Sequence, residues 1–166
     1  MEPVATNEPV TLDSMIVDPA KVSADTGTGY PTPYRHVVAG RERRALGDAV
    51  DLTIFGVNLT RLAPGAASAL RHWHDRQDEF VYVLEGELTL VTDVGEQVLR
   101  PGMGVGFPAG RPIGHHLVNR SSAPAVYLEI GDRTRGDQTH YSEADLVARM
   151  NDDGTDTFTH KDGAPW

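Results

Sequence analysis

Short strand-like runs separated by turn residues dominate the stretch between residues 50 and 131. Apolar and β-branched residues make up runs such as EFVYVLEG, ELTLVTD and AVYLEIG, and turn signals such as Pro64-Gly65 and Pro101-Gly102 separate them. Strands that recur at such close intervals favour a β-sandwich or a β-barrel. The sequence therefore predicts an all-β fold, with the barrel over residues 49–132.

The chain before this stretch has a different character. Residues 1–48 scatter prolines and glycines too densely for long regular elements, as in GTGYPTPY. Apolar residues such as Ile16, Tyr30 and Tyr34 would be unusual in a solvated leader. We expect an irregular N-terminal extension that packs across the barrel or against a partner subunit.

The C-terminal segment, residues 133–166, is predicted to contain one short helix. Ser142 precedes EADLVARM, and Asp145 follows three residues later, which approximates a capping box. Leu146 and Met150 are four residues apart and would share one face of that helix.

Composition excludes several classes of function. The formal net charge of −9 and the pI of about 5.1 argue against nucleic acid and anionic membranes as partners. The absence of cysteine excludes disulfides, thiolate ligands and a cysteine nucleophile. The N-terminus lacks the features of a signal peptide, and no apolar run approaches the roughly 20 residues that cross a bilayer. A cytoplasmic location is expected.

The sequence RHWHDRQDEF indicates a metal site. Alternate side chains of a strand share a face, so His72 and His74 point the same way and Trp73 points the other way. Glu79 begins the next predicted strand and can join the two histidines. Imidazole and carboxylate donors suit transition metals rather than calcium. A solvated polar strand end is the alternative interpretation of this motif.

The strand that begins with Glu79 strengthens the metal interpretation. Val81 and Val83 share its face with Glu79, while the opposite face carries apolar residues, namely Phe80, Tyr82 and Leu84. Such a strand is expected to be buried on both sides. A buried carboxylate needs a partner, and a cation held with two histidines would provide one. If the opposite face is an interface, the chain forms a homodimer.

A third histidine lies in GHHLVN, where His115 and His116 are adjacent. In a strand one of these rings faces inward and the other outward. The residues that would accompany them, Leu117 and Val118, are both acceptable in a core, so hydrophobicity leaves the choice open.

Two motifs resemble those of the cupin family. GAASALRHWHDRQDEFVYVLEG resembles the first cupin motif, and GMGVGFPAGRPIGHHLVN resembles the second. Four residues rather than two separate Gly110 from His115, but keeping three residues before Asn119 favours His115 over His116. The short spacing between the motifs resembles that of compact single-domain bacterial cupins.

The resemblance implies a double-stranded β-helix (a jelly-roll barrel) and one divalent metal ion, Zn, Fe, Mn or Ni. It also implies that His72, His74, Glu79 and His115 hold this ion, with positions left open for a small molecule. Substrates would be small oxygenated metabolites such as sugars, keto acids or phenolic compounds. Isomerase, dioxygenase and decarboxylase chemistry all use similar ligand sets, and the motifs name no general base. The alternative is a non-catalytic, metal-dependent binding or sensing protein.

Overall fold

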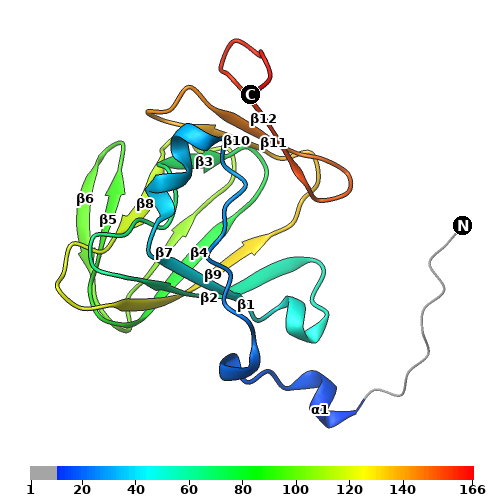
Figure 1. Cartoon of the computed structure of the whole chain (residues 1–166), viewed down its shortest axis with the longest axis vertical. Helices are drawn as coiled ribbons and strands as arrows, with labels where there is room; N and C mark the ends of the chain where they lie inside the picture. Colours follow the sequence, from blue (N-terminus) through cyan, green and yellow to red (C-terminus); the bar gives the residue numbers. More distant parts are fainter. Residues whose placement is uncertain (1–10) are drawn as a thin grey trace, which may run out of the picture.

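Two antiparallel β-sheets form the molecule in a computed structural model that describes residues 11–166 (Figure 1). The first sheet has five strands in the order β1 (Arg41–Ala45), β2 (Phe55–Leu62), β9 (Ala125–Asp132), β4 (Glu79–Glu85) and β7 (Gly104–Phe107). The second has seven, in the order β12 (Asp156–Thr159), β11 (Val147–Met150), β10 (Gln138–Tyr141), β3 (His72–His74), β8 (His115–Val118), β5 (Leu88–Thr92) and β6 (Gly95–Leu99). The predicted all-β, jelly-roll architecture is confirmed.

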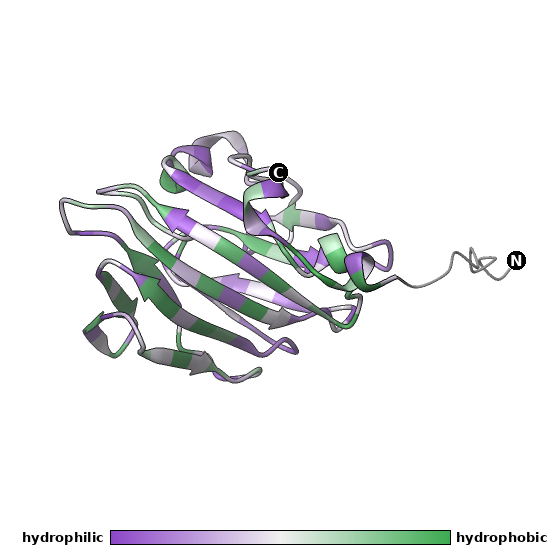
Figure 2. Cartoon of the chain, turned by 90° about the horizontal axis from the view of Figure 1, so that it is seen from below, coloured by the Kyte–Doolittle hydropathy of each residue, from purple (hydrophilic) through white to green (hydrophobic). Residues whose placement is uncertain are grey.

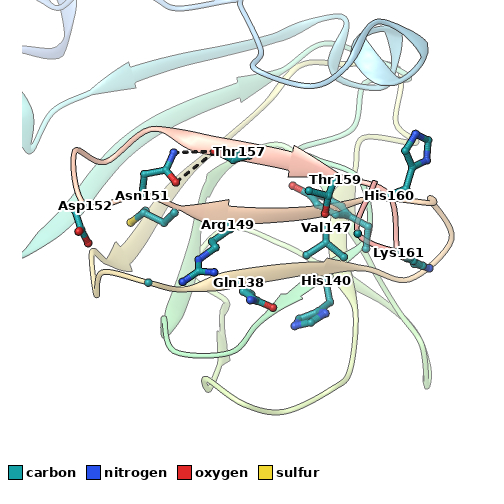
Figure 3. A pocket seen from close by; sticks show the side chains of 14 residues that line it. Gln138, His140, Val147, Arg149, Asn151, Asp152, Thr157, Thr159, His160 and Lys161 are labelled. Atoms are coloured by element: carbon teal, nitrogen blue, oxygen red, sulfur yellow. Dashed lines mark hydrogen bonds between the residues drawn. The ribbon is translucent and has the colours of Figure 1, made fainter. Parts of the chain in front are cut away.

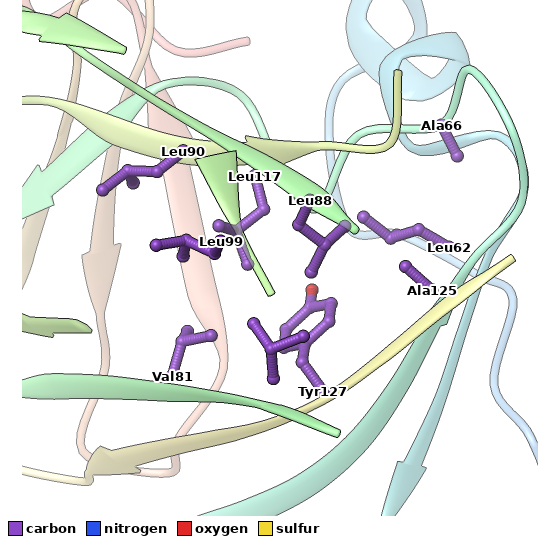
Figure 4. Close-up of a cluster of buried hydrophobic side chains, with 10 residues drawn as sticks. Leu62, Ala66, Val81, Leu88, Leu90, Leu99, Leu117, Ala125 and Tyr127 are labelled. Atoms are coloured by element: carbon purple, nitrogen blue, oxygen red, sulfur yellow. The ribbon is translucent and has the colours of Figure 1, made fainter. Parts of the chain in front are cut away.

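The main core lies between the two sheets. Hydrophobic and polar residues alternate along the strands, so each sheet presents an apolar face inward (Figure 2). Figure 4 shows the buried cluster that results, in which the Tyr127 ring is surrounded by aliphatic side chains. Its members are Leu62, Ala66, Val81, Val83, Leu88, Leu90, Leu99, Leu117, Ala125 and Tyr127.

Gly86 makes the turn between β4 and β5 possible. Its φ of +74° lies in the left-handed region that glycine adopts without steric cost. A Cβ at this position would lie 2.6 Å from the carbonyl oxygen of Pro124, so no other residue fits without a shift of the backbone. This explains why the first motif ends in glycine.

The N-terminal segment packs on the second sheet and builds a second core. Besides α1 (Leu12–Met15), it contains three 3₁₀ helices, η1 (Pro19–Lys21), η2 (Thr32–Val38) and η3 (Asp48–Val50). Tyr30 and Val38 are buried with Tyr141 and Leu146, whereas Ile16 is exposed. Residues 1–10 of the predicted extension lie outside the described part of the chain.

The extension is less irregular than predicted, because Arg41–Ala45 forms strand β1. This strand pairs antiparallel with β2 along its whole length, from Arg41 opposite Leu62 to Ala45 opposite Asn58. Four of the five residues in RERRA are charged, so the sequence lacks the apolar alternation that predicts a strand. These charges are tolerated because β1 is an edge strand whose side chains stay half-exposed.

The prediction of a C-terminal helix is wrong. Residues 142–145 form bends, and β11 follows as a strand that pairs with both β10 and β12. Ala144, Leu146 and Ala148 are buried, which is the two-residue period of a strand rather than the four-residue spacing of Leu146 and Met150. Strand pairing and burial against Tyr30 therefore outweigh the local helix signals.

The outer face of the five-stranded sheet carries apolar side chains. Phe80, Tyr82 and Leu84 of β4 are about 40% exposed, so this strand is not buried on both faces within the single chain. None of the helices among residues 11–166 is long and apolar enough to span a membrane.

Candidate metal centre

Three neighbouring strands bring the predicted ligands together. His72 and His74 lie on β3 and face inward, and His72 is directly opposite His115 on β8. Glu79 is the first residue of β4 in the facing sheet. The site therefore forms where the two sheets meet, from residues far apart in the sequence.

The carboxylate of Glu79 is the centre of this cluster. Its Oε2 lies 2.8 Å from Nε2 of His115, 3.4 Å from Nε2 of His74 and 3.6 Å from Nε2 of His72. The donor atoms of His72, His74 and Glu79 lie within 4.8 Å of one another. All three rings thus present the same nitrogen, Nε2, to one point.

Hydrogen bonds behind the rings fix this orientation. Nδ1 of His72 donates to the carbonyl oxygen of Leu70 at 2.7 Å, and Nδ1 of His74 donates to Oδ2 of Asp137 at 2.6 Å. The other oxygen of Asp137 accepts the backbone N–H of Arg76 at 2.7 Å, so this buried carboxylate is itself held in place. Such outer partners orient histidines that bind metals and select their tautomer.

The structure separates the two adjacent histidines. His115 is buried, stacks on the Phe107 ring and reaches Glu79, as the cupin resemblance implied. His116 turns to the other side of β8, where Nδ1 donates to the carbonyl oxygen of Ala69 at 2.8 Å. Only His115 faces the cluster.

Asn119, the last residue of the second motif, has a structural role. It is fully buried, and its Nδ2 donates to the carbonyl oxygens of Leu62 and Ala123 at 2.9 and 2.8 Å. Its Oδ1 accepts the backbone N–H of Ser121 at 3.0 Å. It closes the turn that follows β8.

Burial and hydrogen bonding shift the ionisation of the cluster. Burial raises the pKa of Glu79, but hydrogen bonds from the three histidines outweigh it and hold that pKa well below its usual range. Burial lowers the pKa of His74, but Asp137 and Glu79 outweigh it and raise the pKa to about 10. Burial lowers the pKa of His115. In the protein alone, the proton on His74 therefore compensates the buried carboxylate of Glu79.

The donor set fits a divalent transition metal. Two rings keep Nε2 free for a ligand because their Nδ1 atoms donate elsewhere, and Nδ1 of buried His115 has no hydrogen-bond partner among residues 11–166. Imidazole nitrogens with one carboxylate oxygen are typical ligands of such ions. A cation at the Nε2 atoms would replace the His74 proton as the charge that compensates Glu79.

A cavity of about 240 Å³ opens onto the cluster. Besides the four cluster residues, its lining includes Arg41 and Arg43 of β1, Glu129 of β9 and Tyr141 of β10. Tyr30 and Phe158 close it from the N-terminal segment and from β12. Sequence reasoning missed Asp137, Arg41, Arg43 and Glu129. Of these, Glu129 had a signal, because it shares a strand face with Ala125 and Tyr127 in AVYLEIG.

A larger hollow, of about 740 Å³, lies elsewhere. Gln138, His140 and Arg149 line it from β10 and β11 (Figure 3). His140 stacks on Trp73, which points away from the metal cluster, so this hollow lies on the outer face of the seven-stranded sheet. His140 pairs with Asp75, and His160 pairs with Asp145. No group of metal-binding residues gathers among these lining residues.

Comparison with known proteins identifies the family. A family model described as a cupin domain matches residues 58–131. A crystal structure from Silicibacter pomeroyi DSS-3, described as a sugar phosphate isomerase of the cupin superfamily, is 46% identical, with 91% of this chain and 96% of that chain covered and a TM-score of 0.87. The chain belongs to the cupin superfamily.

Further cupin-like structures are more distant. A candidate sugar phosphate isomerase from Acidithiobacillus ferrooxidans ATCC 23270 is 25% identical, with 93% and 97% of the two chains covered and a TM-score of 0.77. The polyketide cyclase RemF from Streptomyces resistomycificus is 22% identical over 70% and 78% of the chains, with a TM-score of 0.59, which shows the shared fold. No match was found among proteins with curated functions. The structural relatives of this cupin thus include enzymes of different reaction classes.

Proposed function

We propose that this cupin is a metal-dependent enzyme that interconverts an aldose phosphate and the corresponding ketose phosphate. The observation that carries the proposal is one cavity whose lining includes both the His72–His74–Glu79–His115 cluster and two arginines, Arg41 and Arg43. A divalent metal held by the cluster would supply a Lewis acid for the carbonyl and hydroxyl oxygens of a sugar.

The arginines provide a place for the phosphate. Arg41 donates to two carbonyl oxygens, of Ser68 at 2.6 Å and of Gly27 at 3.1 Å, and no carboxylate of residues 11–166 lies within 4 Å of it. Among residues 11–166, the one carboxylate within 4 Å of the Arg43 guanidinium is that of Asp25, at 3.9 Å. Guanidinium groups whose charge is not neutralised by a close carboxylate bind phosphate through charge-assisted hydrogen bonds.

The position of these arginines also suits a short sugar chain. Arg43 lies on β1 and Glu79 on β4, three strand steps apart in the same sheet. With strands spaced about 4.8 Å apart, the two backbones are roughly 14 Å apart across the strands. The register aligns Arg43 with Val83, four residues from Glu79, which adds an offset of roughly 13 Å along the strand direction. Long arginine side chains reach inward across part of this gap, which leaves room for a small sugar between phosphate and metal. The likeness to the Silicibacter pomeroyi protein supports the same substrate class.

The experiment is a substrate screen. Protein loaded separately with Zn²⁺, Mn²⁺, Fe²⁺ or Ni²⁺ is incubated with aldose and ketose phosphates of three to six carbons and with the unphosphorylated sugars, and products are identified by NMR. We expect isomerisation of a phosphorylated sugar and none in Glu79→Ala. Binding without conversion of any substrate would favour the non-catalytic alternative, and oxygen consumption would indicate dioxygenase chemistry.

The arginines give a second test. Replacing Arg43 with methionine removes one charge-assisted hydrogen bond, so KM for the phosphorylated substrate should rise about 10- to 100-fold. Arg61→Met is the matched control, because Arg61 lies on the outer face of β2, and its one ion pair among residues 11–166 is with Glu42, at 3.6 Å. An unchanged KM in Arg43→Met would show that the substrate phosphate does not bind at Arg43.

A further inference from the structure

Glu129 is a carboxyl group on the inner wall of the cavity. Along β9, Ala125 and Tyr127 are fully buried and Glu129 continues the same face. Its neighbours in the sheet are Asn58 on β2 and Val81 on β4. Isomerisation needs a group that moves a proton between two carbons, and the cupin motifs supply none.

The sheet register places Glu129 beside the His72–His74–Glu79–His115 cluster. Glu79 pairs with Gly131, and Val81 pairs with Glu129, so Glu79 and Glu129 are diagonal neighbours on one face. Diagonal neighbours are roughly 7–8 Å apart. This separation is between backbones, and both side chains line the same cavity, so a substrate bound at the cluster can reach the Glu129 carboxyl.

Glu129 has no partner in the described part of the chain, unlike Glu79 and Asp137. Asp156 of β12 also lines the cavity without a partner there, but only Glu129 lies next to Glu79 in the same sheet. Glu129 makes no hydrogen bond or ion pair with residues 11–166, whereas Glu79 contacts three histidines and Asp137 contacts His74 and Arg76. A carboxyl group with a purely structural role would be hydrogen-bonded, because burying it without partners is costly. An unpartnered carboxyl that lines a cavity is available to a ligand.

The surroundings of Glu129 suit proton transfer. Burial raises its pKa, and the negative charge of Glu79 on β4 adds to this effect. Arg43 and Arg41 on β1 and His72 on β3 oppose it without cancelling it. A carboxyl whose pKa is raised toward neutrality exchanges protons with carbon acids more effectively than one of ordinary acidity.

We propose that Glu129 is the catalytic acid–base residue that carries the proton between adjacent carbons of the sugar phosphate. The inference rests on the proposed function. The carboxylate takes the hydrogen of C2 as a proton, the C–H electrons form the C1–C2 double bond, and the carbonyl oxygen gains a proton to give an enediol. The O2 hydroxyl then loses its proton as the C2 carbonyl forms, and Glu129 returns its proton to C1. In the net reaction, C2 and O2 each lose one proton, and C1 and its oxygen each gain one. The reaction therefore needs no oxidant or reductant.

The test compares Glu129→Gln with Glu85→Gln, which changes an exposed carboxyl at the end of β4. General acid–base groups contribute about 10²- to 10⁴-fold, so kcat of Glu129→Gln should fall at least 100-fold while KM stays within about threefold. Metal content should be unchanged, and inorganic phosphate should bind with equal or greater affinity by calorimetry. Glu85→Gln should match the wild type in every measurement.

The pH profile separates catalysis from structure. In the wild type, kcat/KM should fall as the pH decreases and Glu129 becomes protonated, and the residual activity of Glu129→Gln should lack this limb. A Glu129→Gln variant with kcat within about threefold of the wild type would overturn this inference and leave the proposed function intact. A wild type that converts no sugar phosphate would overturn both.

Discussion

At the scale of single residues, Asp137 orients the His74 ring and would fix how it binds a metal. Its Oδ2 accepts Nδ1–H of His74 at 2.6 Å, which leaves Nε2 free to face Glu79. In Asp137→Asn the amide can present its N–H₂ group to the ring, and the preferred tautomer is lost. We expect metal affinity to fall about 10- to 100-fold, measured by competition with a chelator. Asp75→Asn is the control, because Asp75 contacts His140 on the outer face.

A second prediction at this scale concerns the protein without metal. The pKa of His74 is raised to about 10 in the folded state, whereas it returns to about 6.5 on unfolding. The folded state therefore binds the extra proton more tightly, which contributes stability below pH 6.5 that is lost as the pH rises toward 10. The melting temperature of metal-free protein should fall over this range. His74→Gln should show a smaller decrease, and equal decreases would contradict the assignment.

At the scale of secondary-structure elements, the segment that leads into β11 contributes to the second core, although its sequence resembles a helix. Leu146, just before β11, is fully buried with Tyr30 and Tyr141. Leu146→Ala should lower the free energy of unfolding by about 2–5 kcal/mol, because it removes apolar contacts and leaves a cavity. Leu12→Ala changes an exposed leucine and should cost less than about 0.5 kcal/mol. Urea denaturation of both variants checks the difference.

The sequence predicted the elements whose patterns are local and regular. Alternation predicted the inward face of β4, and the His-x-His spacing with Glu79 predicted the cluster, because both depend only on strand geometry. The choice of His115 over His116 needed the family motif, because the residues that share a strand face with them, Leu117 and Val118, are both apolar.

Other features depended on contacts between distant segments. The strand β11 exists because it pairs with β10 and covers Tyr30, which no local window contains. Asp137 and Arg43 enter the site from segments that carry no motif, so only the fold reveals them.

At the scale of the whole molecule, the outer face of the five-stranded sheet bears on assembly. Phe80, Tyr82 and Leu84 are exposed side by side on β4, and β9 adds the half-buried Leu128 and Ile130. Exposed apolar patches on sheets mark interaction surfaces. The homodimer stays a prediction: light scattering should give about twice the 18.0 kDa chain mass, and Tyr82→Glu should give the monomer mass. A monomeric wild type at micromolar concentration would contradict it.

The most direct test of the central claim is the metal content of untagged protein purified without added metal, measured by mass spectrometry. We predict about one equivalent of zinc, iron, manganese or nickel in the wild type, and its loss in His72→Ala and His115→Ala. His116→Ala should keep the metal, because its ring faces Ala69 rather than Glu79. A metal-free wild type that binds none of the four ions in solution, or equal metal content in all variants, would contradict the account.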